Sequence, residues 1–482
     1  MSRHLTSRRR LIASMGAAGA AGVLAACGAT PTPQVVEKVV KETVVVTSEV
    51  EKVVKETVEV VSTQVVEKEV VVTATPAPKG PVKLVFFYWM TPEQQPLCQA
   101  IFDEFTAANP NISIEVQLAP GDEASKFQKV LLMIAAGTPP DFTAGSTEAP
   151  GYAAKGLLVT LDPYIEASGL DMSLFNQAIL KSYLQYQGQQ ITFPTVASAE
   201  LLAFNPELFD GAGLPYPSET WGDPDWDWAT FIDVATKLTV ETNGKITQFG
   251  NTGLLYYMYA VRWWGGRWAN DEVTQITADT PEMAAGLQEL ADLSLRHHVS
   301  PLSAEWEQFG DQDPLLSGMA ATQSFGLWSL ATYAEATSPW MCATWPAAVD
   351  PLAFFYPMGF YVFTGSQNKD EVWKFIEFMG TPENNLKWAQ AASRMPAMPQ
   401  NGPAWLEYYE AKQPNARMHV ITDLLNYSKA TTAEPFMIHG RYVEIMTKAV
   451  TPSLDPVWLG EKQAKEVLPA LQTQIEDLLK AE

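Results

Sequence analysis

Large aromatic side chains are the residues of this sequence that are best suited to binding chemistry. The 482 residues include 15 Trp, 16 Tyr and 21 Phe, more tryptophan than a core of this size normally needs. An aromatic face can stack on the C–H face of a sugar ring, while a nearby carboxylate, amide or hydroxyl binds the ring hydroxyls. Trp89 and Glu93 combine both features within four residues. Each also has an ordinary interpretation, Trp89 as a core residue and Glu93 as an acid at a helix N-terminus.

A second aromatic group lies between residues 256 and 264. Tyr256, Tyr257, Trp263 and Trp264 occupy four of nine positions in a helix-like stretch before a Gly-Gly pair. One buried helix stripe cannot take all four, so at least one is expected to be exposed or to line a cleft. The pattern does not say which one. Arg262, in the same stretch, is a candidate hydrogen-bond donor to a ligand or a partner in a surface ion pair.

The sequence has no convincing motif for catalysis, cofactor binding or metal binding. It lacks a Gly-x-x-x-x-Gly-Lys phosphate loop and a clear Gly-x-Gly-x-x-Gly fingerprint. Five His and three Cys are too scattered for a zinc or iron–sulfur framework. His297 and His298 are adjacent and would point apart on a helix. We expect neither cofactor nor metal and no enzyme activity, although 55 acidic residues leave a glycosidase carboxylate pair open.

The net charge excludes one class of partner. The formal charge is −23, and a chain cleaved after Ala26 would carry −27, because residues 1–26 hold four Arg and no acid. Such a chain repels phosphate backbones and lacks the cations that release counterions on nucleic-acid binding. We therefore expect no nucleic-acid partner.

The first 26 residues have the order of an export signal. Three arginines at positions 8–10 precede an apolar run of 16 residues, Leu11–Ala26, which is shorter than the roughly 20 residues that span a bilayer. The arginines resemble a twin-arginine signal, with ordinary Sec export as the alternative. Leu24-Ala25-Ala26-Cys27 resembles a bacterial lipobox, in which Cys27 is acylated. We expect a lipid anchor on the extracytoplasmic face of the membrane, in the periplasm or at the cell exterior.

Residues 27–80 are expected to form a tether. Val36–Val44 recurs identically at Val50–Val58, two heptads later. Valines at this spacing suit a coiled-coil seam, but valine also favours extended chain, so the conformation stays open. A Thr-Pro-Ala-Pro-Lys-Gly run at 75–80 marks the domain boundary.

The elements that must position these residues alternate between strand and helix from residue 82 on. Val82–Trp89 is a nearly continuous apolar run that predicts a buried strand. Apolar residues at 97, 101 and 105 predict a helix that ends at Asn109, and alternation at 112–118 predicts a second strand. Further helices are predicted at Lys126–Ala136 and around 372–379, before Gly380. This order favours an α/β fold, and its length favours two lobes.

Motifs along this region resemble the extracellular solute-binding proteins of ABC importers, in the family that binds maltose-like sugars. The resemblance covers Val82 to the C-terminus and rests on the order and spacing of motifs at 135–141, 156–165, 193–194, 204–214, 315–328 and 359–378. It implies a two-lobed periplasmic-binding-protein (clamshell) fold, each lobe a mainly parallel sheet flanked by helices. By this resemblance the lobes are 81–194 plus 358–400 and 195–357 plus 401–482. The chain crosses between them at 193–203 and 356–363, with a return near 394–400.

The resemblance also assigns candidate ligand contacts. Trp89 and Glu93 would face the cleft, Glu148 would keep the acid of a loop whose usual aromatic is replaced by Gly145-Ser146, and Trp328 would stack on a sugar. Ser198 on the first crossing could offer a hydroxyl or bond to backbone, and Asp141 is expected to hold a turn. Gly359 and Phe360 would enter the cleft at the second crossing. Tyr257, Trp263 and Trp264 complete the candidates from the aromatic stretch.

The expected function is therefore that of a lipid-anchored binding component, monomeric and without cofactor, that captures a mono- or oligosaccharide and delivers it to ABC permease subunits. Alternatives are a binding protein for polyamine or peptide, an extracytoplasmic glycosidase, and a sensor that presents ligand to a receptor. Cys98 and Cys342 are expected to stay unpaired, because a bridge between the two lobes would lock the clamshell.

Overall fold

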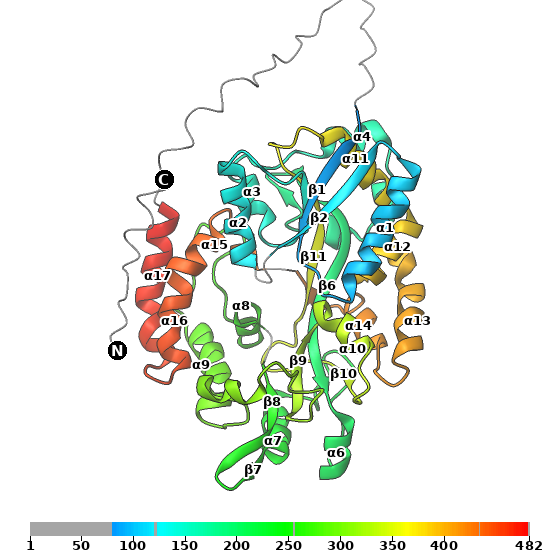
Figure 1. Cartoon of the computed structure of the whole chain (residues 1–482). Helices are drawn as coiled ribbons and strands as arrows, with labels where there is room; N and C mark the ends of the chain where they lie inside the picture. Colours follow the sequence, from blue (N-terminus) through cyan, green and yellow to red (C-terminus); the bar gives the residue numbers. More distant parts are fainter. Residues whose placement is uncertain (1–79, 120–122, 254–255, 433, 481–482) are drawn as a thin grey trace, which may run out of the picture. The chain divides into compact units, whose positions relative to one another are not determined.

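The structure is a computed structural model that describes residues 80–119, 123–253, 256–432 and 434–480, drawn in colour in Figure 1. Gly80–Glu482 form one compact unit. The expected export signal, Cys27 and nearly all of the expected tether lie outside the described residues. Among the helices that are described, none is both long enough and apolar enough to cross a bilayer.

The first strand and its neighbours form where the apolar pattern predicts them. β1 (Val82–Tyr88) lies between two parallel strands, β2 (Ile112–Leu118) and β3 (Phe142–Gly145). Helix α1 (Gln94–Ala108) ends at the predicted Asn109, but its predicted apolar stripe is only partly right. Leu97 is 42% exposed, and Cys98 and Phe102 are buried instead.

Two long buried strands connect the ends of the main sheet. β6 (Phe193–Phe204) and β11 (Ala353–Val362) pair antiparallel from Phe355↔Ala199 to Phe360↔Phe193. On its other edge β11 pairs with β3 from Gly359 to Val362. β6 from Glu200 on pairs with β9 (Ala320–Gly326) and, at 202–204, with β10 (Met341–Ala343). β6 therefore changes partners near Glu200.

The strand order is β2-β1-β3-β11-β6-β9-β8-β7, with parallel pairs at β1–β2, β1–β3 and β8–β9. The remaining strands are β7 (Val240–Thr242), β8 (Lys245–Thr252), β12 (Met395–Pro396) beside β6, β13 (Ala430–Thr431) beside β11, and the hairpin β4 (Gln185–Tyr186) with β5 (Gln189–Gln190).

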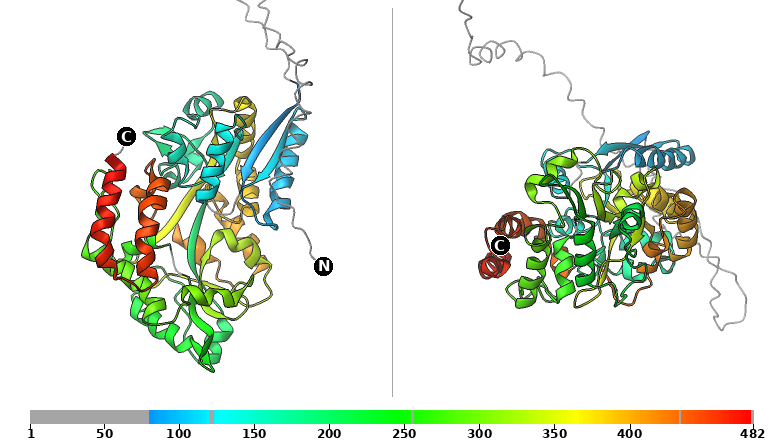
Figure 2. Two further views of the ribbon diagram at one scale, coloured as in Figure 1. Left: turned by 60° about the vertical axis from the view of Figure 1, so that its left-hand side comes forward. Right: turned by 90° about the horizontal axis from the view of Figure 1, so that it is seen from below.

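Helices cover the sheet on opposite sides. On one side α12 (Pro382–Ala391) contacts both α1 and α13 (Gly402–Lys412), and on the other α9 (Pro281–Leu295), α16 (Thr451–Trp458) and α17 (Ala464–Lys480) contact one another (Figures 1 and 2). The other helices are α2 (Glu123–Ala135), α3 (Ala149–Ala153), α4 (Asp162–Ser168), α5 (Gln177–Leu180), α6 (Pro206–Ala212), α7 (Trp228–Leu238), α8 (Tyr257–Ala260), α10 (Leu330–Ala334), α11 (Lys369–Met379), α14 (His419–Leu424) and α15 (Tyr442–Ile445). The predicted face of α11 is fully buried.

The apolar core consists of two large clusters. The first joins β1, α1, α11 and α12 around Phe86, Phe360 and Trp388, and the second surrounds Trp263 and Trp268. The first cluster also includes side chains of α13 and α14, so its extent differs from the predicted lobe 81–194 plus 358–400. Cys98 and Cys342 are buried free thiols of this same cluster.

Candidate ligand-binding site

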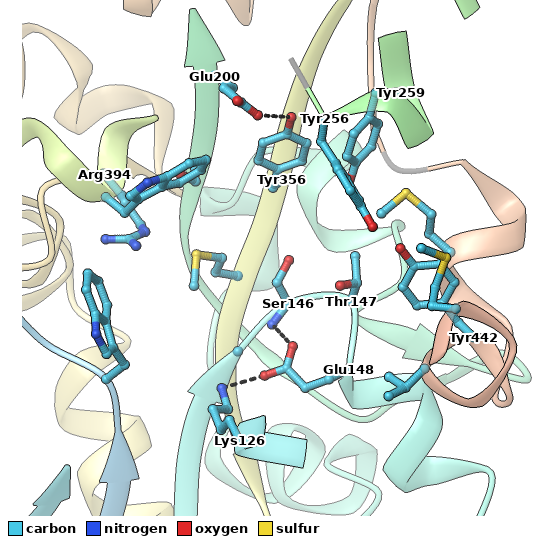
Figure 3. A pocket seen from close by; sticks show the side chains of 18 of the residues that line it. Lys126, Ser146, Thr147, Glu148, Glu200, Tyr256, Tyr259, Tyr356, Arg394 and Tyr442 are labelled. Carbon is cyan, nitrogen blue, oxygen red and sulfur yellow. Dashed lines mark hydrogen bonds and ion pairs between the residues drawn. The ribbon is translucent and has the colours of Figure 1, made fainter. Parts of the chain in front are cut away.

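A cavity of about 800 Å³ lies where β6 changes partners. Its volume is in the range of pockets that enclose small ligands. Twenty residues line it: Tyr88, Trp89, Lys126, Gly145, Ser146, Thr147, Glu148, Ser198, Glu200, Tyr256, Tyr259, Trp328, Tyr356, Met358, Arg394, Met437, Tyr442, Val443, Met446 and Thr447. Figure 3 shows ten of them labelled.

The loop between β3 and α3 forms one wall. The buried Glu148 carboxylate accepts a hydrogen bond from the Ser146 backbone N–H at 2.9 Å and pairs with Lys126 Nζ at 2.5 Å (Figure 3). The Tyr361 hydroxyl donates to the same carboxylate at 3.0 Å, and the Ser146 hydroxyl lies 2.8 Å from that of Tyr183. Glu148 thus has its oxygens engaged within the protein.

The charge of Glu148 is compensated. Burial alone raises the pKa of this carboxyl, but the Lys126 ammonium and the hydrogen bond from Ser146 outweigh burial and hold the pKa below its usual range. Lys126 also donates to the Ala144 carbonyl oxygen at 2.9 Å. The pair ties α2 to the loop that carries Ser146.

Strand β6 contributes two polar side chains to the cavity. Ser198 and Glu200 are two residues apart and so point to the same face of the strand. The Ser198 hydroxyl is buried and has no hydrogen-bond partner in the described structure. A buried hydroxyl without a partner is costly, so a ligand hydroxyl in this cavity would satisfy it.

Glu200 is a buried acid with neutral partners. The Ser324 hydroxyl donates to one carboxylate oxygen, and the Tyr356 hydroxyl donates to the other at 3.3 Å. Burial raises the pKa of Glu200 to about 7, although hydrogen bonds from Ser324, Tyr356 and the Tyr256 backbone offset part of that effect. Near neutral pH this side chain can therefore donate or accept a hydrogen bond.

Aromatic side chains form the wall of the cavity that lies across from Arg394 (Figure 3). Tyr256, Tyr259 and Tyr442 lie together on one side of the pocket in Figure 3. The ring of Tyr259 lies 4.8 Å from that of Tyr356, centroid to centroid. Tyr256 is 38% exposed, so its ring is accessible to a ligand.

Trp89 and Trp328, both candidate ligand contacts, also line the cavity. Trp328 follows β9 and is 37% exposed. Its indole lies directly over Gly326, where an added Cβ would approach Cζ2 of the ring to 2.1 Å. Glycine at 326 therefore allows this position of the ring.

Six of the residues predicted to contact ligand do not line this cavity: Glu93, Tyr257, Trp263, Trp264, Gly359 and Phe360. Glu93 is exposed at the N-cap of α1, and Trp263 is a fully buried core residue whose Nε1 donates to the Leu352 carbonyl. Tyr257 lines a second cavity of about 300 Å³, and half-buried Trp264 contacts Trp228.

Gly359 and Phe360 pack within the protein on strand β11 and do not line the cavity. A Cβ on Gly359 would meet the Phe193 carbonyl oxygen at 2.0 Å, so the close approach is between β11 and β6. Phe360 is fully buried in the first core cluster. Asp141 was expected to hold a turn, but its carboxylate makes long-range contacts instead. It accepts from the Val85 backbone N–H and from the Ser366 and Asn368 side chains, and so links β1 to the segment before α11.

Several lining residues were missed by sequence reasoning. Glu200 could have been found, because a strand that brings Ser198 to the cavity brings residue 200 to the same face. Tyr356 could also have been found, because it is the first residue of the predicted second crossing at 356–363. Arg394 had no signal beyond its place at the predicted return, and Lys126 and Tyr442 had none. Within the described residues, no group of three His, Cys, Asp or Glu side chains could hold a metal.

Comparison with known proteins agrees with this architecture. Residues 91–386, more than half of the chain, match the family of bacterial extracellular solute-binding proteins. The chain belongs to this family. The predicted family resemblance is thereby confirmed.

Individual relatives are distant. The maltotriose-binding protein of Pyrococcus abyssi is 22% identical over 316 residues, which are 64% of this chain and 64% of that protein. The match thus spans less than two thirds of that relative. An ABC substrate-binding protein from Listeria monocytogenes, solved with cycloalternan, is 22% identical with a TM-score of 0.72, over 83% of this chain and 99% of the other.

The maltose/maltodextrin-binding domain from Bdellovibrio bacteriovorus, solved with maltotriose, is 14% identical with a TM-score of 0.69, over 83% of this solute-binding protein and 100% of the other chain. At identities this low, the structural similarity shows that the fold is shared and shows nothing about the ligand. The predicted two-lobed α/β binding-protein fold is confirmed.

Proposed function

We propose that this solute-binding protein captures a carbohydrate in the 800 Å³ cavity and delivers it to the permease of an ABC importer. The observation that carries the proposal is the lining itself. It combines accessible aromatic faces at Tyr256 and Trp328 with the unpartnered Ser198 hydroxyl and the Glu200 carboxyl. Sugar rings need both an apolar plate and hydroxyl partners.

The relatives support this ligand class, because the three that are named above are named for maltotriose or were solved with cycloalternan or maltotriose. The ligand contacts in the proposal are Trp89, Ser146, Ser198, Glu200 and Trp328, with Tyr256. Glu148 acts by holding the Ser146 loop. No catalytic step is part of the proposal.

The cellular setting in the proposal rests on the N-terminal sequence. The lipobox at Cys27 would anchor the chain to the extracytoplasmic face of the membrane, and residues 27–80 would link the anchor to the folded unit. Membership of an extracellular solute-binding family supports this location.

A thermal-unfolding screen of the full chain tests the ligand class. Neutral and acidic mono- and oligosaccharides, sugar phosphates, polyamines and short peptides are each added at increasing concentration. A ligand at about 100 times its dissociation constant adds roughly 2.7 kcal/mol to the free energy of unfolding. We expect a saccharide to raise the melting temperature. A rise with polyamines or peptides alone would overturn the carbohydrate assignment.

Trp328→Ala locates the site. Loss of one stacking face is expected to weaken saccharide binding by about 3- to 10-fold. Trp306→Ala is the matched control, because Trp306 is 45% exposed and lines the second, smaller cavity instead of the proposed one. Equal binding by both variants would place the ligand elsewhere.

A further inference from the structure

Arg394 is a buried cation in the cavity lining. It is 4% exposed and follows α12 through Ser393, whose φ of 57° places a non-glycine residue in the left-handed region. Such a conformation is uncommon and is kept where the surrounding structure requires it. Figure 3 shows the Arg394 side chain on the side of the pocket opposite Tyr256 and Tyr442.

The guanidinium of Arg394 has few partners. Nη1 donates to the Ala392 carbonyl oxygen, while Nε is enclosed and has no acceptor. None of the ion pairs in the described residues includes Arg394. A guanidinium carries five N–H donors and stays charged at any physiological pH. Within the described residues, the charge of Arg394 has no acid partner and its Nε donor has no acceptor.

The neighbouring groups do not neutralise this charge. Lys126 and Glu148 compensate each other, and Glu200 bonds to Ser324 and Tyr356. The Cys98 thiol and the Tyr409 phenol lie near enough to feel the positive charge of Arg394, but burial raises the pKa of both, and both are neutral.

From this geometry we infer that the bound carbohydrate carries an anionic substituent, a carboxylate or a phosphate or sulfate ester, and that Arg394 binds it. The inference rests on the proposed carbohydrate function and narrows its substrate class. A buried charge without a counter-ion is unfavourable, and arginine presents parallel N–H groups that match a carboxylate or phosphate.

The net negative charge of the chain means that a local cation is needed to attract an anionic ligand. The chain carries −23, so its general field does not attract anions. Selection of an acidic sugar would come from this one local contact, with the sugar ring against the tyrosines across the pocket.

Isothermal titration calorimetry on the full chain tests the inference. The probes are uronic-acid oligosaccharides, sugar phosphates, sulfated sugars and the matched neutral saccharides. We expect one acidic class to bind more tightly than its neutral counterpart. Arg394→Gln is expected to weaken that binding by about 10- to 100-fold and to remove the preference over the neutral sugar.

Arg296→Gln is the matched control for the loss of one positive charge, because Arg296 is exposed and pairs only with Asp292. Arg394→Lys keeps the charge but not the paired N–H groups, and intermediate affinity is expected. The class of acidic sugar that binds shows whether Arg394 recognises a carboxylate or a phosphate or sulfate ester.

Three results would contradict the inference in distinguishable ways. Tight binding of neutral sugars that Arg394→Gln leaves unchanged would overturn it while keeping the carbohydrate function. Binding of polyamines or peptides alone would overturn the function itself. A lower melting temperature of ligand-free Arg394→Gln with unchanged affinity would mark Arg394 as structural, since removal of an uncompensated buried charge is expected to raise that temperature.

Discussion

At the scale of single residues, Glu200 is a carboxyl whose pKa is set by its buried surroundings. Its carboxyl is buried among hydroxyl donors, and its pKa is about 7 instead of its ordinary 4.5. The folded state therefore binds a proton that the unfolded state releases between these two pH values. Stability must fall as pH rises through this window, which is the opposite of the usual behaviour of paired carboxylates.

Glu200→Gln should remove this pH dependence. Between pH 5 and pH 8, the free energy of unfolding of the wild type is expected to fall by on the order of 3 kcal/mol more than that of the variant. Urea unfolding at pH 5, 6, 7 and 8 measures the difference. The variant keeps an amide oxygen to accept one hydroxyl, so both proteins should fold.

Parallel pH profiles of the two proteins would show that Glu200 does not titrate in this range. Glu207→Gln serves as the control, because Glu207 lies in the first turn of α6, outside the cavity lining. It should leave the profile of the wild type unchanged.

At the scale of elements, the cavity wall depends on one buried ion pair between α2 and the β3–α3 loop. Lys126 and Glu148 are both almost fully buried, and Glu148 also accepts from the Ser146 backbone and from Tyr361 on β11. Removal of one charge from such a pair leaves the other without compensation. The loop that presents Ser146 would then lose its support.

Lys126→Met is expected to lower the free energy of unfolding by about 3–5 kcal/mol. The double variant Lys126→Met with Glu148→Gln should recover part of this loss, because no buried charge remains. Urea unfolding at pH 7 measures all three proteins. Lys237→Met, which breaks an exposed pair with Asp233, is the control and should change stability by less than about 1 kcal/mol.

A loss for Lys126→Met no larger than that of the exposed control would mean that the buried pair does not hold the loop. A double variant as unstable as the single one would point instead to lost packing of the Lys126 stem against Tyr88, whose ring lies 5.8 Å from Nζ.

At the scale of the whole folded unit, β6 and β11 are the strands shared by both ends of the sheet. The lobes expected from the family resemblance, 81–194 plus 358–400 and 195–357 plus 401–482, would meet along these strands. A ligand that contacts residues from both sides of the cavity would favour a closed arrangement, with the change absorbed at the crossings.

Hydrogen exchange on the full chain, with and without saccharide, tests this closure. Peptides over 145–148 on one side and over 256–260 and 442–447 on the other should gain protection together. The buried helix α11 provides the control and should exchange at the same rate in both states. Protection confined to one side would mean that the ligand binds without bringing the lobes together.

Local patterns in the sequence were sufficient for much of the fold. A continuous apolar run specifies β1, and a 3.6-residue spacing specifies α11, because each buries one face and the period follows from backbone geometry. The same reasoning misplaced Leu97, since a choice between adjacent helix faces depends on what packs there.

The site was only partly within reach of such reasoning. Trp89, Ser146, Glu148, Ser198 and Trp328 were singled out by the family resemblance, and all of them line the cavity; that they contact a ligand stays a prediction. The aromatic stretch at 256–264 was rightly expected to place a ring at a cleft. Only the structure decides which rings these are: Tyr256 and Tyr259 line the large cavity and Tyr257 lines the second one, whereas Trp263 is buried in the second core cluster.

The sequence by itself determined the family, several of the strands and helices, and the type of chemistry available, because these depend on residue types and near neighbours. The tertiary structure decided which charges are compensated. Lys126 meets Glu148 and Glu200 meets Tyr356 across 22 and 156 positions of the chain, while Arg394 meets no acid at all in the described residues. Burial and distance set the energy of a charge, and both are properties of the folded chain.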